Sequence, residues 1–302
     1  MRHITIVEVS PRDGLQNDPA QLSTGQKIEL VERCVAAGVR RIEVASFVNP
    51  KRVPQMADAE AVIAGLPVGG GQSADYIGLV LNERGFERAR QTALQEVNLV
   101  VMVTDEFSQR NQGMPTRGAL DTVAKVAPLA RAAGLVTSVT MSASFGCPYT
   151  GEVPVGRVAD VAAEIAAIGV DEVAIADTIG VAVPADVRHR VAAVREVVGY
   201  TRLRVHVHNT RNTGYASALA AADAGVTVLD SSLGGIGGCP FAPNATGNIA
   251  TEDLVFALER SGYDTGLDLD ELCRASEWLA AQLGRPVPSL LPKAGGFPPP
   301  AA

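Results

Sequence analysis

The stretch Arg202-Leu-Arg-Val-His-Val-His208 is rich in residues that favour β-strands, and the alanine-rich segment 212–224 follows it. A second β-rich stretch, 226–232, begins directly after Ala224-Gly225. The alanine-rich segment is typical of a helix, and a glycine after its last residue supplies the left-handed conformation that often ends a helix. A strand, a helix and another strand in this order predict a β-α-β unit, whose two strands lie parallel in one sheet.

The same alternation extends outward along the chain. Further β-rich stretches lie near 3–9, 41–47, 76–81, 97–104, 135–143 and 172–177. Helical stretches lie between them at 24–37, 119–133, 156–168 and 185–198, and two of these end in the same Ala-Gly pair, at Ala37-Gly38 and Ala133-Gly134. Eight strands with helical crossovers predict an α/β fold of the closed (β/α)₈ type, a TIM barrel.

The segment after the eighth strand sets the domain boundary. Residues 251–290 have a helical pattern, and we expect them to cover part of the barrel as additional C-terminal helices. We therefore predict one barrel domain over residues 1–290 and a flexible Pro/Gly-rich tail over residues 291–302. An open doubly wound sheet is the alternative fold, but no G-x-G-x-x-G motif follows the first strand to support it.

Composition limits the classes of function. Of the 302 residues, 47% are hydrophobic and only 4% aromatic, so the core must be aliphatic, as in parallel strands buried on both faces. The net charge is -7 with no basic cluster, so we expect no nucleic-acid partner, and an anionic ligand would need local Arg or Lys groups and a metal ion. The first residues have the pattern of a strand rather than a signal peptide, and no apolar run reaches membrane-spanning length. Four cysteines without a C-x-x-C pair complete the expectation of a cytoplasmic protein with free thiols and no membrane partner.

Candidate metal ligands follow two of the predicted strands. His206 and His208 lie two residues apart at the end of the seventh strand, so their side chains point to the same side. Asp13, within Pro11-Arg-Asp-Gly14, follows the first strand, and Arg12 beside it can stabilise negative charge. The carboxyl ends of the strands meet at one mouth of such a barrel, and barrel enzymes have their active sites there. The alternatives are one core histidine with one solvated histidine, and an ordinary Pro-Arg-Asp-Gly turn.

Two further carboxylates lie in apolar strands, where a buried charge is costly unless it is paired. Glu43 belongs to the second strand and Asp177 to the end of the sixth. Each could line the site or act as a structural partner, Glu43 of Arg12 and Asp177 of a nearby donor. For Glu43 the residues themselves favour the structural role.

A glycine-rich segment follows the eighth strand and leads to Cys239. Its four glycines predict a mobile loop that can approach a ligand closely and present the thiol to it. A plain flexible loop with an incidental cysteine is the alternative. Asn248, a few residues later, could offer a carbonyl oxygen to a metal ion, and Cys147 is a second thiol that could line the site.

With these residues in view, the chain resembles the 3-hydroxy-3-methylglutaryl-CoA (HMG-CoA) lyases, in particular bacterial ones. The resemblance rests on Pro11-Arg-Asp-Gly-Leu-Gln-Asn17, Ser46-Phe-Val-Asn-Pro-Lys51, Gly237-Gly-Cys-Pro-Phe-Ala242 and Thr246-Gly-Asn248. The Arg-Asp-Gly turn and the His-x-His strand mark a wider group of metal-dependent barrels. The Gly-Gly-Cys-Pro loop is the part that points to the lyases.

The resemblance implies a role for each candidate residue. The metal ligands would be Asp13, His206, His208 and Asn248, with Mg²⁺ or Mn²⁺ as the ion. Arg12 would stabilise the enolate of the departing acyl-CoA, and Cys239 would be the catalytic thiol. Glu43 would support Arg12 and the ligands, and Asp177 would line the site.

The implied reaction is the metal-dependent cleavage of (S)-HMG-CoA to acetyl-CoA and acetoacetate, in leucine degradation, by a homodimer or higher homo-oligomer. Three positions depart from the family pattern: Arg52, Thr140 and Asn209. These departures keep open a lyase for another 3-hydroxyacyl-CoA, such as a 3-hydroxy-3-alkylglutaryl-CoA. A synthase of the same barrel group that condenses acetyl-CoA is a further alternative, disfavoured because only about 55 residues follow Asn248.

Overall fold

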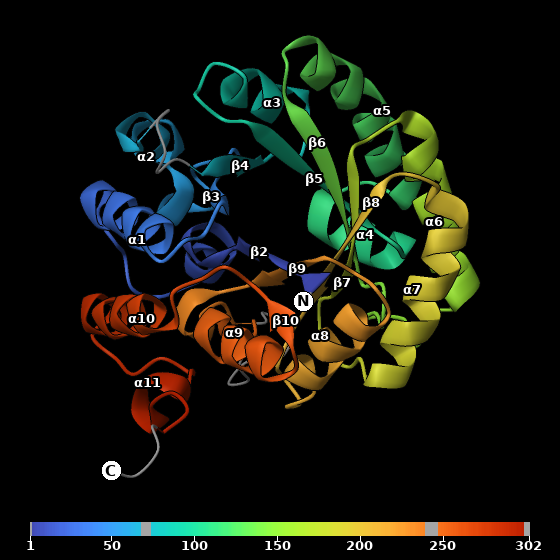
Figure 1. Ribbon diagram of the computed structural model, residues 1–302. Helices are drawn as coiled ribbons and strands as arrows, with labels where there is room; N and C mark the ends of the chain where they lie inside the picture. Colours follow the sequence, from blue (N-terminus) through green and yellow to red (C-terminus); the bar gives the residue numbers. More distant parts are fainter. Residues whose placement is uncertain (1, 68–73, 239–246, 299–302) are drawn as a thin grey trace.

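The computed structural model describes residues 2–67, 74–238 and 247–298. Its centre is a closed barrel of eight parallel strands in sequence order, as Figure 1 shows. The strands are β2 (Thr5–Glu8), β3 (Arg41–Ser46), β4 (Asp75–Leu79), β5 (Glu96–Met102), β6 (Val136–Ser142), β7 (Glu172–Asp177), β8 (Arg202–Val207) and β9 (Val228–Ser231). Strand β9 pairs with β2 and closes the barrel, so the predicted TIM-barrel fold is confirmed.

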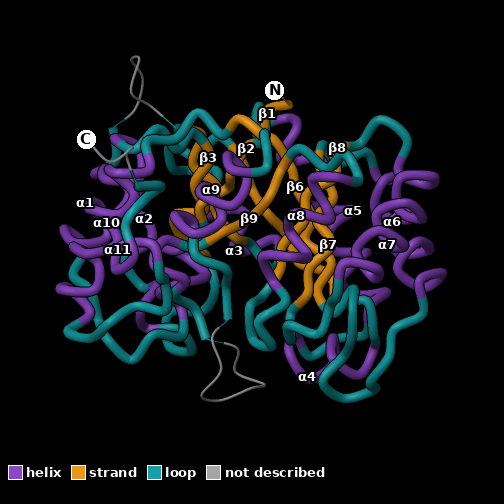
Figure 2. The backbone as a smooth tube through the Cα atoms, turned by 60° about the horizontal axis from the view of Figure 1, so that its bottom comes forward, coloured by secondary structure: helices purple, strands orange, loops and turns teal. Residues whose placement is uncertain are grey.

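Helices form a ring around the strands (Figure 1). Those that follow the barrel strands are α1 (Thr24–Ala36), α2 (Ala59–Gly65), α3 (Glu83–Ala89), α5 (Thr116–Ala132), α6 (Val155–Ile168), α7 (Pro184–Val198), α8 (Gly214–Asp223) and α9 (Thr251–Arg260). An additional helix, α4 (Asp105–Gln112), follows β5 directly and lies beyond the carboxyl ends of the strands, on the side away from the N-terminus (Figure 2). No helix of the described residues is long and apolar enough to cross a membrane.

Local sequence signals explain where helices begin and end. Ser23 and Gln26 form a capping box at the start of α1, each side chain accepting a hydrogen bond from the other residue's backbone N–H. The three Ala-Gly stops place Gly38, Gly134 and Gly225 at φ of 97°, 73° and 87°, the left-handed region that a side chain disfavours. Each helix therefore ends abruptly and lets the chain enter the next strand.

The barrel has two cores of different chemistry. Aliphatic side chains such as Ile42, Val97 and Val205 lie in the large apolar cluster between strands and helices. Polar and charged side chains fill the inside instead, because Arg41 of β3 bonds Glu172 of β7, and these two strands lie on opposite sides of the barrel. The interior is therefore polar, unlike the aliphatic layers common in this fold.

The C-terminal region packs outside the barrel. Helix α10 (Leu269–Leu283) lies beside α1, and Gln26 donates a hydrogen bond to Gln282 across them (Figure 1). The region 251–290 also contains a two-residue strand, β10 (Tyr263–Asp264), which pairs with β1 (Arg2–His3) and which the helical pattern did not predict. Within the range predicted as a tail, Leu291–Ala294 forms the short helix α11.

Candidate active site

The turn after β2 carries two of the predicted site residues. Residues Ser10–Gly14 form a single wide helical turn, in which the carbonyl of Val9 accepts hydrogen bonds from the N–H groups of Arg12, Asp13 and Gly14. A Cβ atom at Gly14 would lie 2.8 Å from a side-chain carbon of Ile236, so only glycine fits against the glycine-rich segment. The turn therefore projects Arg12 and Asp13 at the barrel mouth.

His206, in β8, and His208, which follows directly after that strand, both lie at this mouth. Their ring centroids are 4.9 Å apart, and both residues are buried. Ligand atoms of Asp13, His206 and His208 all lie within 4.8 Å of one another. No other group of three or more His, Cys, Asp or Glu side chains in residues 2–67, 74–238 and 247–298 could hold a metal ion. The structure thus brings three of the four predicted ligands together.

The two imidazoles differ in their surroundings. Burial lowers the pKa of His206, but its hydrogen bond to Asp230, 3.1 Å from Nδ1 to Oδ2, and the charge of that carboxylate outweigh burial and raise the pKa. Burial and the neighbouring His206 lower the pKa of His208 to about 3. Both ring nitrogens of His208 are buried without a hydrogen bond, although the Thr178 backbone lies close enough to oppose that shift weakly. His208 is therefore a neutral imidazole with lone-pair capacity that the described residues leave unused.

Asn248, the fourth predicted ligand, lies beside the other three. It stands opposite His208 in an isolated bridge between the two chain segments. Its amide nitrogen donates to Asp13 Oδ2 at 2.9 Å and to the carbonyl of Ile236 at 3.1 Å. This orientation makes its side-chain oxygen the atom available to an ion. Cys239 lies outside the described residues.

Arg12 is held between two carboxylates. Its Nε donates to Glu43 Oε2 at 2.7 Å and its Nη1 donates to Asp13 Oδ1 at 2.6 Å. Burial lowers the pKa of Arg12, but the charges of Glu43 and Asp13 outweigh it and raise the pKa. Asn98 donates to the other oxygen of Glu43 at 3.0 Å. Glu43 is therefore the partner that orients Arg12, the structural role that its own strand favoured.

The carboxylate of Asp177 turns to the loop after β7. Its two oxygens accept hydrogen bonds from the backbone N–H groups of Val181 and Ala182, at 3.0 and 2.8 Å. Burial raises its pKa, against the lowering effect of these hydrogen bonds. Among the described residues, Ala176 of β7 and Thr178, directly after that strand, line the cavity, whereas Asp177 between them does not. These contacts support Asp177 as a structural partner of the loop after β7, and its role in lining the substrate site stays a prediction.

Glu8, at the end of β2, joins segments of the mouth that the sequence did not connect. One of its oxygens accepts hydrogen bonds from the N–H groups of Ser10 and Leu233, at 2.8 and 2.9 Å. The other accepts from the hydroxyl of Thr251 at 2.6 Å. Glu252 holds the next amide, Gly234, at 3.1 Å. The turn that carries Arg12 and the start of the glycine-rich segment are therefore tied to one buried carboxylate.

A cavity of about 190 Å³ opens beside these groups. Its polar lining includes Arg12, Asp13, Asn98, Thr140 and both histidines, and its apolar lining includes Val48, Leu79 and Met102. Apolar walls with a few convergent polar groups are typical of a small-molecule site. Cys147, the second predicted thiol, is buried elsewhere, where its sulfur accepts a hydrogen bond from Thr104 at 3.1 Å.

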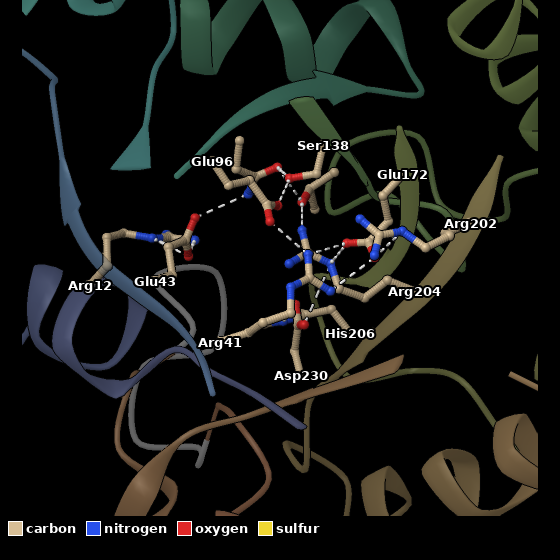
Figure 3. Close-up of polar contacts among 12 residues, drawn as sticks. Arg12, Arg41, Glu43, Glu96, Ser138, Glu172, Arg202, Arg204, His206 and Asp230 are labelled. Atoms are coloured by element: carbon tan, nitrogen blue, oxygen red, sulfur yellow. Dashed lines mark hydrogen bonds and ion pairs between the residues drawn. The ribbon is translucent and has the colours of Figure 1, made fainter. Parts of the chain in front are cut away.

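Below the cavity lies a set of ion pairs that the sequence analysis missed, which we call the ionic layer: Arg41, Glu96, Glu172, Arg204 and Asp230 (Figure 3). Arg41 donates to both oxygens of Glu172 at 3.0 Å and to Glu96 at 2.8 Å. One sequence signal could have predicted this layer. Residues two apart in a strand face the same side, and Arg41, Glu96 and Arg204 each stand two residues before a polar residue of the mouth.

The residues of the mouth fit a divalent cation. The buried ion pairs of the layer and mouth join five carboxylates (Asp13, Glu43, Glu96, Glu172 and Asp230) to three guanidinium groups (Arg12, Arg41 and Arg204). With neutral imidazoles and without Arg202, whose side chain is 52% exposed, the set carries two excess negative charges. Buried charge needs compensation, and a dication at Asp13, His206 and His208 would supply it. The buried nitrogens of His208 are the donors such an ion would use.

A closed parallel barrel with an arginine and a possible Asp-His-His metal site at its carboxyl-end mouth is an arrangement typical of barrel enzymes. Comparison with known proteins narrows this class. A sequence model of the HMGL-like family matches residues 3–279, and the chain belongs to that family. The named relatives are CoA lyases, so the protein is an enzyme of the carbon–carbon lyase class.

Individual relatives match over nearly their whole length. An (R)-citramalyl-CoA lyase of Chloroflexus aurantiacus is 44% identical over 98% of this chain and 96% of its own. The crystal structure of the Bacillus subtilis HMG-CoA lyase superposes with a TM-score of 0.94 at 35% identity, covering 97% of this chain and 98% of that one. An HMG-CoA lyase of Acinetobacter baumannii, in complex with coenzyme A and 3-methylmalate, gives a TM-score of 0.92 at 36% identity, covering 99% and 98%.

Proposed function

We propose that the protein cleaves the C2–C3 bond of a branched 3-hydroxyacyl-CoA with a terminal carboxylate, with (S)-HMG-CoA as first candidate substrate and acetyl-CoA and acetoacetate as products. The observation that carries the proposal is the joint position of Arg12, Asp13, His206 and His208 around one cavity. Mg²⁺ or Mn²⁺ is the expected ion. When bound by Asp13, His206, His208 and Asn248, it would supply Lewis-acid polarisation of the substrate hydroxyl.

The chain's own residues account for the charges that move. The proton of the C3 hydroxyl leaves to a base, for which the carboxylate of Asp13 is the candidate side chain at the cavity. The electron pair of the C2–C3 bond then passes to the thioester oxygen, while C3 becomes the carbonyl of the departing oxo acid. Arg12 stabilises the enolate oxygen, and Glu43 keeps its guanidinium in place. The thiol of Cys239 would protonate C2 to give acetyl-CoA.

The size of the cavity indicates which part of the substrate it can hold. At about 190 Å³ it is smaller than the roughly 300–1,000 Å³ usual for sites that enclose a whole ligand. It therefore suits the acyl group, with the CoA portion outside the barrel mouth. The net charge of -7 attracts no anion, so a carboxylated acyl group depends on Arg12 and the ion.

A second candidate substrate is (R)-citramalyl-CoA. The relative named for it is 44% identical, whereas the two HMG-CoA lyase structures are 35% and 36% identical. This acyl chain is one methylene shorter than HMG, and the same cleavage would give acetyl-CoA and pyruvate. One methylene group in a pocket changes the binding free energy by about 1–3 kcal/mol. We therefore expect the two substrates to undergo the same cleavage at different rates.

A direct assay tests the proposal. Purified protein with Mg²⁺ or Mn²⁺ is incubated with (S)-HMG-CoA, (R)-citramalyl-CoA and a longer 3-hydroxy-3-alkylglutaryl-CoA, and acetyl-CoA is measured together with acetoacetate or pyruvate. We expect acetyl-CoA from at least one of the first two, and none after treatment with a chelator. No acetyl-CoA from any thioester would overturn the lyase assignment, and undiminished release after chelation would overturn the metal dependence.

A further inference from the structure

Asp230 lies where the ionic layer meets the mouth. It belongs to β9, which pairs with β8, the strand that carries His206. Its Oδ2 lies 3.1 Å from Nδ1 of His206, and its Oδ1 lies 3.5 Å from Nε of Arg204 (Figure 3). The side chains of Asp230 and Arg204 are 5% and 1% exposed, so water competes little for either contact. Asp230 is thus held to His206 through Oδ2, while its Oδ1 faces Arg204 at ion-pair distance without a hydrogen bond.

A carboxylate at this position decides where His206 carries its proton. A neutral imidazole has one N–H, and the nitrogen that faces a buried acceptor is the one that keeps it. Nδ1 faces Asp230, so the N–H lies there and the lone pair lies on Nε2. Carboxylate partners of this kind orient histidines that bind metal ions and increase their basicity.

We propose that Asp230 is a positioning residue, which holds His206 with its Nδ1–H toward β9 and leaves Nε2 as the atom that binds the divalent ion. This inference rests on the metal site of the proposed function and goes beyond it, because it assigns a tautomer and gives the ionic layer a task. Arg204 forms ion pairs with Asp230 at 3.5 Å and with Glu172 at 3.3 Å. The order Glu172, Arg204, Asp230, His206 is therefore a chain of contacts that leads from the ionic layer to the proposed metal site.

Metal affinity provides the first test, with matched variants. Asp230→Ala removes the acceptor and the charge, whereas Asp230→Asn keeps one acceptor oxygen, removes the charge and replaces the other oxygen with an NH₂ group. Glu96→Gln is the control, because Glu96 belongs to the same layer and bonds Arg41 and Ser138 but not His206. Loss of such a partner typically weakens metal binding about 10–100-fold. We expect the dissociation constant for Mn²⁺, measured by electron paramagnetic resonance, to rise by that factor in Asp230→Ala, less in Asp230→Asn, and by less than about threefold in Glu96→Gln.

The tautomer provides a second readout that needs neither metal nor turnover. Long-range ¹H–¹⁵N spectra of the metal-free protein, with His206 assigned through a His206→Gln variant, report which ring nitrogen carries the proton. We expect Nδ1–H in the wild type and in Glu96→Gln, and loss of that preference in Asp230→Ala. An Nε2–H form in the wild type, or equal Mn²⁺ affinity in Asp230→Ala and Glu96→Gln, would overturn the inference. If Asp230→Ala does not fold, Asp230→Asn carries the affinity comparison and the wild-type spectrum carries the tautomer.

These measurements separate the inference from the proposed reaction. If no thioester is cleaved but Mn²⁺ binding depends on Asp230, the positioning role stands and the lyase assignment fails. If a thioester is cleaved while Mn²⁺ affinity does not respond to Asp230, the lyase assignment stands and the positioning role fails.

Discussion

The mouth and the ionic layer are built on the same strands, but their polar side chains are paired in different ways. Arg41 and Glu43 lie on β3, and Arg204 and His206 lie on β8, each pair two residues apart and on the same side of its strand. In the layer, Arg41 donates hydrogen bonds to both of its carboxylate partners, and Arg204 forms longer ion pairs in which its Nε makes no hydrogen bond. In the mouth, His208 is buried with neither ring nitrogen hydrogen-bonded.

The difference shows which region is built for stability and which for binding. A buried ion pair has a large cost if one partner is lost, so the paired layer holds the barrel interior in one arrangement. A buried polar group without a hydrogen-bond partner is costly unless a ligand supplies that partner, and His208 is such a group beside a cavity. Apart from Asp230, which contacts His206 directly, substitutions in the two regions should therefore act on different quantities.

The largest effect is expected at the mouth, from His208→Ala. Loss of this donor should remove tight Mn²⁺ binding and lower kcat/KM on the order of 10³-fold, because Lewis-acid catalysis contributes several kcal/mol. The fold should remain, because His208 makes no hydrogen bond that its removal would break. Activity and Mn²⁺ affinity are compared with those of His189→Ala, an exposed histidine on α7. Wild-type metal affinity in His208→Ala would show that the two regions do not differ as described.

Next in size is a substitution in the layer, Arg41→Met. It leaves Glu172 and Glu96 buried with one cation fewer, which typically costs about 3–5 kcal/mol of unfolding free energy. Urea unfolding measures the loss, and kcat of the folded fraction should stay within about threefold of the wild type. Arg117→Met is the control, since Arg117 also bonds two carboxylates, Asp121 and Glu164, but its side chain is 68% exposed. That control should lose less than about 1 kcal/mol.

A third variant, Cys239→Ala, tests whether the thiol belongs to the mouth. Loss of a general acid typically lowers the rate on the order of 10²-fold or more. We expect this loss in kcat with Mn²⁺ affinity unchanged, because the thiol is not a predicted ligand. Cys273→Ala, on α10, should keep full activity. Full activity in Cys239→Ala would exclude the thiol as proton donor.

The smallest effect concerns Glu252, which holds Gly234 at the start of the glycine-rich segment. Burial raises the pKa of Glu252 from 4.5 to about 7, against hydrogen bonds from Ser276, Ser289 and the backbone. Because the folded state binds this proton more tightly, its stabilising contribution is complete below pH 4.5 and is lost as the pH rises through 7.

Glu252→Gln should abolish that dependence. Relative to the wild type, it should gain about 2 kcal/mol of unfolding free energy between pH 5 and pH 8. Urea unfolding at both pH values measures the change, and the exposed Glu277→Gln is the control. A difference between Glu252→Gln and the wild type that is the same at both pH values would contradict a raised pKa.

Periodic and local features of the structure could be predicted from the sequence. The strand–helix alternation and Ala-Gly stops predicted the barrel, and the two-residue spacing of His206 and His208 predicted their common direction. Contacts between distant strands could not be predicted in this way. Arg41 and Glu172 are 131 residues apart, and only closure of the barrel places them face to face. The partnership of Asp230 with His206 likewise depends on the register of β8 and β9, which no spacing in the chain reveals.

The carboxylate of Glu8 has a consequence for redesign of substrate choice. It holds Ser10, Leu233 and Thr251 at once, so residues 233–248 should not be exchanged independently of the turn that carries Arg12. In a chimaera that takes residues 233–250 from another lyase, a shift of Leu233 would also shift Glu8 and the turn that carries Arg12. Such an exchange should keep Glu8 and Thr251 together, because replacing either one shifts the anchor that both sides of the mouth share.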